Sequence, residues 1–375
     1  MNKILIISEY HYNNKSGGGI STAISNIFLY LKDDFNFTFL SDNKMSNQKK
    51  NLFDIKTVFI NNNLFYFIRL FFFLKNNYFK KVHINGLFSK NYSFVSLVIC
   101  SIFYSGEIII SPRGMLKKTA INGSLTKKIY LSILRLILNK KKIIFHCTSK
   151  EEIEETSLFF KNFKSVLISD LPPKRIKKKY ITKKDSQILN IISIGRIVDL
   201  KNLYFVLTTL MSISKIKNNN IANLNLDICG LIYDFKYWRK CKKIIDELIK
   251  YPNINIKYHG EIEKDKINSL FKKSHLLFFP SKGENYGFVI SESLSNLVPV
   301  LTSDNTAFDL EKFSFFGFSI SLNKKKDFIK IIQNYINLSQ DEFNSLRKNI
   351  YKNYNTFMKI NLKTEDFKML YKQCL

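Results

Sequence analysis

Cysteine is scarce in this sequence of 375 residues, which contains five, at positions 100, 147, 229, 241 and 374. The number is odd, and no two of them have the Cys-x-x-Cys spacing. This pattern argues against a disulfide framework and against a zinc site, and it fits a reducing cytosol. No cluster of His, Cys and Asp has metal-ligand spacing either, so we expect no bound metal and no cofactor.

Long apolar runs are also missing. The longest run beyond the N-terminus, Phe94–Tyr104, is interrupted by serines and is shorter than the roughly 20 residues that a membrane-spanning helix needs. At the N-terminus only Ile4–Ile7 are consecutive apolar residues before Ser8 and Glu9, which predicts a buried strand rather than a secretory signal. We therefore expect a cytoplasmic protein.

Acidic residues are few: 30 Asp and Glu stand against 59 Lys and Arg, a formal net charge of +29. Only seven of the basic residues are arginines. Lysines create a diffuse positive field, whereas the arginine fork recognises phosphates and bases by geometry. The excess predicts an anionic partner, either a nucleotide, a nucleic acid or an acidic lipid surface. Part of it reflects a composition that is rich in Asn, Ile, Phe and Lys throughout.

Short apolar runs alternate with helical patterns along the whole chain. In the first half, strands are expected at 4–7, 37–40, 81–84, 107–110 and 143–146, with a glycine loop at 17–19 before the first helix. In the second half, they are expected at 188–194, 224–228, 254–258, 276–279 and 299–302. Such alternation predicts parallel strands joined by crossover helices, hence an α/β fold with doubly wound sheets.

A break separates the two halves. Two prolines at 172 and 173 are followed by a basic run up to Lys184, which predicts a linker over residues 173–186. We expect a first domain over 1–172, a second over 187–352, and a C-terminal helical segment, 353–375, that packs back on the first domain. Two similar Rossmann-like domains would then face each other across a cleft.

Candidate binding residues follow the ends of predicted strands, where ligands of open α/β sheets bind. After Gly195, Arg196 and Lys201 flank the start of a helix, and free backbone N–H groups at a helix start favour an anion. A diphosphate is the ligand that this arrangement suits. The alternative is a pair of surface side chains in a lysine-rich protein.

Two glutamates, Glu284 and Glu292, flank the start of a later helix. The apolar positions of that helix leave Glu292 off its buried face. An ionised carboxylate only accepts hydrogen bonds, which suits the hydroxyls of a ribose or a hexose. The alternative role of Glu292 is a favourable interaction with the helix dipole.

Together these motifs resemble the family-4 retaining glycosyltransferases of GT-B fold, also described as group 1 glycosyl transferases, of the bacterial surface-polysaccharide type. The resemblance rests on Glu-x7-Glu after an apolar strand and Pro-Ser, on Gly-Arg-x4-Lys-Asn upstream, and on segments 82–86, 111–116, 146–149 and 284–287. It implies metal-independent transfer from a nucleotide-diphosphate sugar, UDP- or GDP-linked, to a glycan or polyprenyl-linked hydroxyl.

The resemblance also implies roles for individual residues. Arg196, Lys201 and Glu284 would be the catalytic residues. The donor would contact Gly18, Gly19, Gly195, Arg196, Lys201, Glu284, Asn285, Tyr286, Gly287, Phe288, Val289 and Glu292. On the acceptor side stand His83, Asn85, Arg113 and His146.

The chain departs from the family pattern at Asn85, Arg113 and Leu297, where relatives often have histidine, histidine and glycine. The first two departures leave the identity of a catalytic histidine open. A nucleotide-sugar epimerase of the same fold and a non-enzymatic, basic nucleic-acid-binding protein are the alternative functions. Scattered lysines argue against the latter, so we expect no nucleic-acid partner. The apolar helix with basic ends at 127–142 and the aromatic-rich stretch at 64–74 predict peripheral contact with an anionic membrane, such as the inner face of the plasma membrane. Considered alone, 127–142 is better explained as a core helix with solvated lysine ends.

Overall fold

The structure is a computed structural model, which describes residues 1–12, 18–42, 53–117, 121, 124–138, 142–173, 184–185, 187–216, 223–306, 310 and 314–372. The chain divides into two compact units, Met1–Leu171 with Asn361–Leu375, and Pro172–Ile360. Most of the expected basic linker, namely residues 174–183 and 186, lies outside the described residues.

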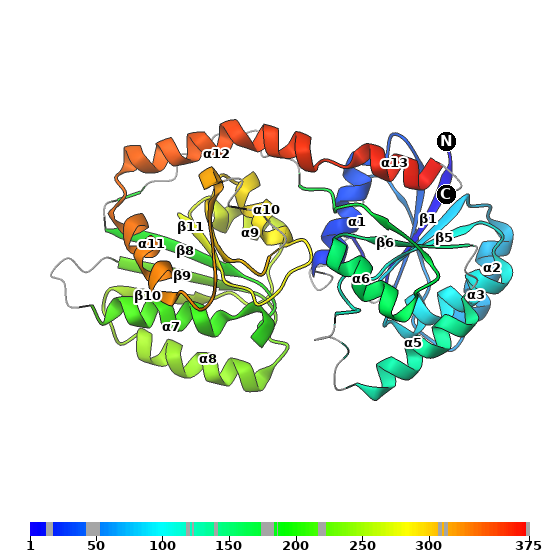
Figure 1. The fold of residues 1–375 in the computed structure, drawn as a ribbon, viewed down its shortest axis with the longest axis horizontal. Helices are drawn as coiled ribbons and strands as arrows, with labels where there is room; N and C mark the ends of the chain where they lie inside the picture. The colour runs from blue at the N-terminus through cyan, green and yellow to red at the C-terminus, as the bar shows by residue number, and fades with distance from the viewer. Residues whose placement is uncertain are drawn as a thin grey trace. The chain divides into compact units, whose positions relative to one another are not determined.

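The first unit is built around a sheet of seven parallel strands in the order β3-β2-β1-β4-β5-β6-β7 (Figure 1). The strands are β1 (Lys3–Ile7), β2 (Asn36–Ser41), β3 (Lys56–Phe59), β4 (Lys81–Asn85), β5 (Glu107–Ser111), β6 (Ile143–Cys147) and β7 (Lys164–Leu167).

Helices cover both faces of this sheet, because successive strand residues point to opposite sides. Ile4 and Ile6 belong to the core beneath α1 (Gly18–Leu31) and α13 (Thr364–Lys372). Leu5 and Ile7 belong to the core on the other face. The elements on that face are α2 (Tyr66–Asn76), the π-helix η2 (Lys90–Val95), α3 (Ser96–Phe103), α5 (Leu125–Ile137) and α6 (Lys150–Phe159).

The second unit repeats this plan with six parallel strands in the order β10-β9-β8-β11-β12-β13. The strands are β8 (Ile188–Ile194), β9 (Asn223–Cys229), β10 (Ile254–Tyr258), β11 (Leu276–Phe279), β12 (Val300–Ser303) and β13 (Gly317–Ile320). One face is covered by α7 (Leu203–Ser214), α8 (Phe235–Leu248) and α11 (Lys325–Asn337). The other is covered by α9 (Lys264–Phe271), α10 (Phe288–Ser295) and α12 (Gln340–Asn361).

Each sheet has one point where the direction of chain progression reverses. In the first unit β1 lies between β2 and β4, and in the second β8 lies between β9 and β11. The loops after the two central strands at such a point diverge to opposite faces of the sheet, which leaves a crevice at their carboxyl ends. In the second unit this crevice lies next to the loops that follow β8 and β11.

The α/β class and the doubly wound sheets are confirmed, but three strands escaped prediction. They are β3, β7 and β13, and each is four residues long and lies at the edge of its sheet. Their side chains are mostly half-buried or exposed. An edge strand packs against fewer neighbours, so its sequence lacks the continuous apolar run that marks a central parallel strand.

The expected C-terminal segment is two helices rather than one. Its expected start at residue 353 falls inside α12. That helix ends at Asn361, and Leu362 and Lys363 separate it from α13. Phe367, Leu370 and Tyr371 of α13 are fully buried in the first unit.

A buried lysine fixes the end of α13. Lys81 on β4 is 1% exposed, and its Nζ donates to the carbonyl oxygen of Leu370 at 2.6 Å. The same nitrogen forms an ion pair with Glu107 Oε2 at 2.7 Å. Lysine near a helix C-terminus satisfies carbonyls that have no partner within the helix and complements the helix dipole. Lys81 therefore joins the sheet to the C-terminal helix.

We expect Lys81→Met to lower the free energy of unfolding of the first unit by about 2–4 kcal/mol, because it leaves a largely buried carboxylate and a carbonyl without their donor. The matched control is Lys80→Met, because Lys80 is only half-buried and donates to Lys372 O at 2.5 Å. The control should cost below about 1 kcal/mol. Trp238, the single tryptophan, reports the second unit. A loss seen by circular dichroism without a matching change in its fluorescence transition locates the effect in the first unit, and equal losses in both variants would contradict this role.

Candidate functional site

The site in the second unit begins where β8 ends. Gly195 follows the strand, and a side chain added there would meet the stem of Lys201 at 3.3 Å. Gly230, after β9, has φ +144°, and a Cβ on it would overlap the carbonyl oxygen of Gly195 at 1.8 Å. Two glycines thus let the β8 and β9 loops pack closely and let Lys201 lie across the strand end.

Lys201 reaches the loop that follows β11. Its Nζ forms an ion pair with Oε1 of Glu284, with the two side chains 18% and 11% exposed. Ser281 Oγ lies 2.7 Å from the same oxygen and donates to it. Lys201 Nζ also lies 5.5 Å from the centre of the Phe279 ring. Among the described residues, both of these contacts with the Glu284 carboxylate are made by Oε1.

Backbone contacts hold the two loops in register. The amide of Lys282 donates to the carbonyl oxygen of Leu200 at 2.8 Å. Asn202, which adopts φ 59°, donates from Nδ2 to the carbonyl oxygen of Pro280 at 3.1 Å. Because these bonds join the loops after β8 and β11, the Lys201–Glu284 pair is fixed at the crevice of the second sheet.

Arg196 is exposed, and its guanidinium lies over the ring of Tyr233, 5.2 Å from the ring centre. It therefore shares the loop after β8 with Lys201 but is held to one side by a cation–π contact. Such a contact contributes about 0.5–1 kcal/mol at an exposed site, so the side chain can leave it for a stronger anionic partner.

The N-terminus of α10 lies just beyond Glu284. Gly287 caps the helix with φ 74° and ψ 53°, a left-handed conformation that favours glycine. The backbone N–H groups at Phe288 and Val289 belong to the first turn, where a helix lacks internal acceptors for them. The rings of Tyr286 and Phe288 lie 4.7 Å apart. Asn285 and Glu292 are half-buried, Glu292 in the second turn of the helix.

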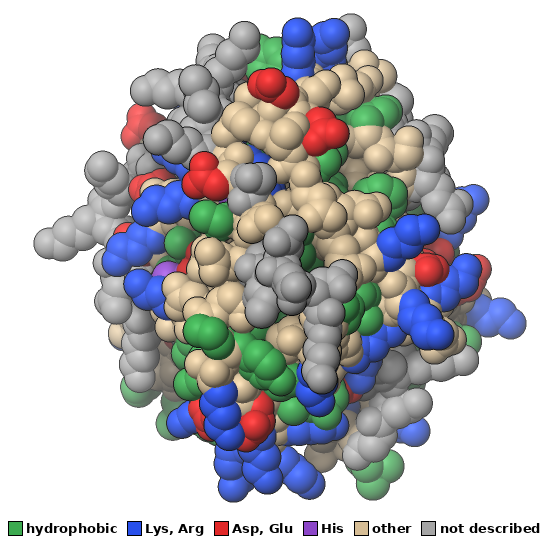
Figure 2. Space-filling model, turned by 90° about the vertical axis from the view of Figure 1, so that its left-hand side faces the viewer, with side chains coloured by type: hydrophobic (Ala, Val, Ile, Leu, Met, Phe, Trp, Pro, Cys, Tyr) green, Lys and Arg blue, Asp and Glu red, His purple; other side chains and the backbone are tan. Residues whose placement is uncertain are grey.

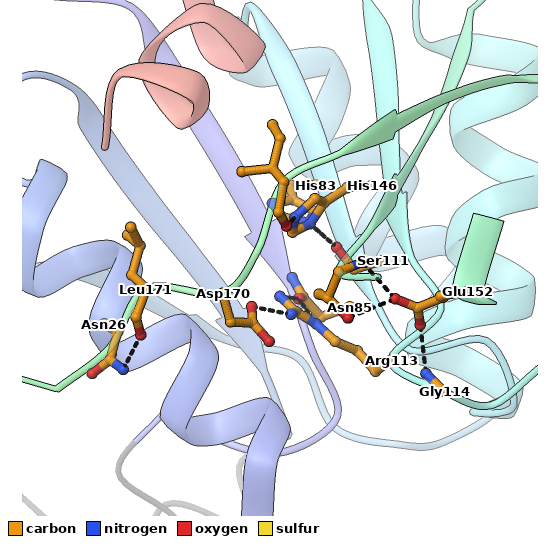
Figure 3. A network of polar contacts seen from close by, with 12 residues as sticks. Asn26, His83, Asn85, Ser111, Arg113, Gly114, His146, Glu152, Asp170 and Leu171 are labelled. Atoms are coloured by element: carbon orange, nitrogen blue, oxygen red, sulfur yellow. Dashed lines mark hydrogen bonds and ion pairs between the residues drawn. The ribbon is translucent and has the colours of Figure 1, made fainter. Parts of the chain in front are cut away.

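The first unit holds the other predicted residues in a separate network (Figure 3). Arg113, with φ 58°, donates from Nε and Nη2 to Asn85 Oδ1 at 3.2 and 2.9 Å and pairs through Nη1 with Asp170. Burial raises the pKa of the Asp170 carboxyl, and the charge of Arg113 opposes that rise. Nearby, Glu152 accepts from the amides of Gly114 and Thr148 at 2.6 and 2.7 Å.

Two buried histidines lie in a chain of hydrogen bonds in which every donor points the same way along the chain. His146 Nε2 must donate to the carbonyl oxygen of Ile168 at 2.8 Å, so in the neutral ring Nδ1 accepts from Ser111 Oγ at 2.8 Å. Ser111 then accepts from His83 Nε2 at 2.7 Å, and His83 Nδ1 accepts from the hydroxyl of Tyr371 at 2.8 Å. The chain of bonds runs from α13 across β4, β5 and β6.

Both imidazoles are neutral in this arrangement. Burial lowers the pKa of His146 to about 3, with a further contribution from Arg113. Burial, followed by the charges of His146 and Arg113, lowers the pKa of His83 well below its ordinary value. All four residues expected on the acceptor side are at most about one-twentieth exposed: His83 and His146 are 0% exposed, Asn85 4%, and the Arg113 side chain 5%. Their bonds hold the loops around them, although Asn85 Nδ2 is buried without a hydrogen-bond partner among the described residues.

The predicted glycines of the first unit lie at the start of α1. Gly18 has φ 50°, and a Cβ added to it would meet no atom within 4 Å. Gly19 is exposed. Gly17 lies outside the described residues.

The sequence alone did not reveal several partners. Ser281 was visible only as part of the Pro-Ser motif, and Gly230 as a glycine after a strand. Asp170, Glu152 and Tyr371 had no local signal, because their partners lie 57, 38 and 288 positions away along the chain. Among the described residues, no group of three or more His, Cys, Asp or Glu is arranged to hold a metal ion. Within the same part of the chain, no helix has the length and apolar character needed to cross a membrane.

Solved structures show where this fold occurs. Sucrose-phosphate synthase from Thermosynechococcus elongatus is 14% identical, with 100% of this chain and 99% of that one covered and a TM-score of 0.70. HepE of Anabaena, solved with UDP and glucose, is 12% identical over 100% of both chains, with a TM-score of 0.69. WaaG, a glycosyltransferase of lipopolysaccharide biosynthesis, is 12% identical over 99% of both, with a TM-score of 0.67. The fold is the GT-B fold of glycosyltransferases.

A family model matches one region of the sequence. Residues 174–355 match the model of the group 1 glycosyl transferases, so the second unit carries a group 1 glycosyl transferase domain. This region contains Arg196, Lys201, Glu284 and Glu292. No curated protein sequence matches the chain.

The histidine chain predicts an acid-sensitive first unit. The folded state holds His146 neutral, whereas the unfolded chain protonates it below its ordinary pKa of 6.5, so stability falls as the pH drops from 6.5 towards about 3. One such group contributes a slope of up to about 1.4 kcal/mol per pH unit. We expect His146→Gln to reduce the slope by that amount. Tyr371→Phe, which breaks one bond but keeps both imidazoles, should retain it. Unfolding at a series of pH values measures both, and an unchanged slope in His146→Gln would contradict the assignment.

Proposed function

We propose that this chain is a retaining, metal-independent hexosyltransferase. It would move a sugar from a nucleotide-diphosphate donor, UDP- or GDP-linked, to a hydroxyl of a glycan or lipid-linked glycan in surface-polysaccharide synthesis, for O-antigen, capsule or lipopolysaccharide. The observation that carries the proposal is the Lys201–Glu284 pair at the crevice of the second sheet, within the segment that matches the group 1 glycosyl transferases.

The donor would lie across this crevice. An ammonium group has three N–H donors, so Lys201 can keep its bond to Glu284 and still bind a phosphate oxygen. Arg196 would leave Tyr233 to form charge-assisted bonds with the same diphosphate. The amides at Phe288 and Val289 favour negative charge at the start of α10. Glu292 would accept the ribose hydroxyls, and Glu284 Oε2 a hydroxyl of the transferred sugar.

The reaction needs little covalent chemistry from the protein. The bond between the anomeric carbon and the diphosphate oxygen breaks, the acceptor oxygen bonds to the same face of that carbon, and the acceptor proton passes to the leaving phosphate. Arg196 and Lys201 would stabilise the charge that develops on the diphosphate, and positioned cations of this kind contribute most of a rate enhancement.

The first unit would bind the acceptor. His83, Asn85, Arg113 and His146 would act there as positioning residues, since their side chains are buried and bonded within the unit. The solved relatives support a glycan role: WaaG acts in lipopolysaccharide biosynthesis, and HepE was solved with UDP and glucose.

One face of the protein argues against nucleic acid as its partner there. On the face drawn in Figure 2, Lys and Arg side chains are scattered, with acidic, apolar and polar side chains between them. Nucleic-acid binding requires a continuous basic patch or stripe.

The proposal is tested by thermal stabilisation with UDP, GDP, ADP and CMP and their sugar conjugates. We expect one nucleoside diphosphate to raise the melting temperature of the second unit. Glu292→Ala should lower the affinity for that nucleotide by about 10-fold, because the ribose contact is lost, with little change in the stability of the protein. Glu247→Ala, which removes a carboxylate that is 59% exposed on α8, is the matched control. Stabilisation by no nucleotide would reject the donor site, and equal affinity in both variants would reject the ribose role.

The cationic residues are tested by transfer kinetics. Arg196→Gln and Lys201→Met should reduce kcat by about 100-fold or more, because each removes charge that stabilises the leaving diphosphate. Methionine keeps the stem that covers Gly195 but leaves the Glu284 carboxylate without its lysine. Thermal unfolding of each variant is therefore measured beside its kinetics, and kcat is compared at a temperature where every variant is folded. Lys250→Met, at a side chain that is 66% exposed, is the control and should leave kcat unchanged.

Product analysis by NMR gives the anomeric configuration, and inversion would contradict the retaining assignment.

A further inference from the structure

Three helices on one side of the first unit expose large apolar side chains. On α2 and the residue before it, Phe65, Ile68 and Phe72 are 62%, 50% and 52% exposed. Leu64, just before them, is 91% exposed. A soluble protein rarely leaves several phenylalanines and leucines together in water, and contiguous patches of this kind mark interaction sites.

The helix α5 presents a second apolar stripe. Leu125, Ile129, Ile133 and Leu136 follow one another at helical spacing and are 42–85% exposed. They are distinct from Leu131 and Leu134, which face the core. The helix therefore has two apolar faces, of which the interior of the unit uses one.

The two helices are joined by α3. Phe71 of α2 and Phe103 of α3 have ring centres 4.9 Å apart, and Ser101 of α3 donates to the carbonyl oxygen of Ile137 at 3.2 Å. The end of α3 adds Ile102 and Phe103, which are 60% and 55% exposed. In Figure 1 the three helices lie on the same side of the first sheet. We refer to their exposed side chains as the α2–α3–α5 surface.

Charge on this surface has one sign. The three helices contain no Asp or Glu, whereas they carry Arg69, Lys75, Lys127, Lys128 and Arg135. On α5, Lys128 and Arg135 are exposed along the edge of the apolar stripe. Apolar side chains flanked by basic ones fit a phase that is apolar inside and negatively charged at its surface.

We propose that the α2–α3–α5 surface docks on an anionic lipid bilayer, with its phenylalanine, isoleucine and leucine side chains in the interface and its basic side chains at the lipid phosphates. A second copy of the chain fits less well, because the same surface would bring like charges opposite one another without any acidic partner. Docking itself does not depend on the proposed function. Only its biological purpose does, which would be to bring the first unit to a lipid-linked acceptor.

The test is co-sedimentation of the full chain with vesicles of phosphatidylcholine and with vesicles of an equimolar mixture of phosphatidylcholine and phosphatidylglycerol. We expect binding to the mixed vesicles, weaker binding to phosphatidylcholine alone, and loss of binding as salt screens the phosphates. The triple variant Ile68→Ser, Phe72→Ser, Leu136→Ser should bind the mixed vesicles at least about 10-fold more weakly. These side chains are exposed, so folding should be kept.

Two control variants separate this surface from general apolar and electrostatic effects. Leu158→Ser, Phe235→Ser, Ile249→Ser removes apolar side chains of similar exposure elsewhere, at 64%, 68% and 54%, and should bind as the wild type does. Arg69→Gln, Lys128→Gln, Arg135→Gln should reduce binding more than Lys326→Gln, Lys330→Gln, Lys348→Gln, although both remove three exposed charges.

Equal binding by the apolar triple variant and its control would overturn the proposal. A wild-type dimer that becomes monomeric in the triple variant, without vesicle binding by either, would overturn it in favour of self-association. Nucleotide stabilisation is measured on the same proteins, since it reports the second unit. Vesicle binding without nucleotide binding would reject the proposed function and leave the docking surface supported, and the reverse result would do the opposite.

Discussion

Both units depend on one constraint, the burial of a parallel sheet on its two faces. Helices cover each face, so the interior strands are mostly apolar, and the polar side chains that they do carry, such as Lys81 and His83, are bonded inside the unit. The order of strands reverses once in each sheet, and the loops diverge only there. In the second unit the loops after β8 and β11 lead to helices on opposite faces of the sheet, but the loops themselves are bonded to each other at the strand ends. This topology explains why Lys201 and Glu284, separated by 83 positions, form an ion pair.

Every doubly wound sheet has a crevice at its strand ends, and the Lys201–Glu284 pair gives this crevice its particular chemistry. A lysine and a glutamate that are both mostly buried restrict each other's position, and Ser281 fixes the carboxylate further. The pair provides a cation next to a carboxylate, and among the described residues Lys201 and Ser281 both contact that carboxylate through Oε1. A nucleotide-sugar presents the complementary groups, a diphosphate next to sugar hydroxyls. The first unit uses its polar residues differently. Arg113 is bonded to Asn85 and Asp170, and His83 and His146 are joined through Ser111, so these side chains hold the loops beside the sheet.

Much of this could be predicted from the sequence, and the limits have physical causes. Central strands such as β8 and β11 are mostly or wholly apolar, so their positions and even their ends were predicted, along with the glycine and charged residues that follow them. The edge strands β3, β7 and β13 are short and partly exposed, so they carry no such signal. The partners of Arg113 and His83 could not be predicted, because Asp170 and Tyr371 approach them only through tertiary packing. The exposed stripe on α5 was hidden for a related reason: periodicity shows that a helix has apolar faces, but not which of them is buried.

The central claim is that Lys201 recognises the diphosphate of a donor. The most direct test is calorimetric titration of the wild type and of Lys201→Met with a nucleoside and with its diphosphate, using the base that stabilises the protein best. The substitution should lower the affinity for the diphosphate by about 10-fold or more and leave the affinity for the nucleoside unchanged, because only the phosphates would contact the ammonium group. An equal loss for both ligands, or no loss for either, would contradict it.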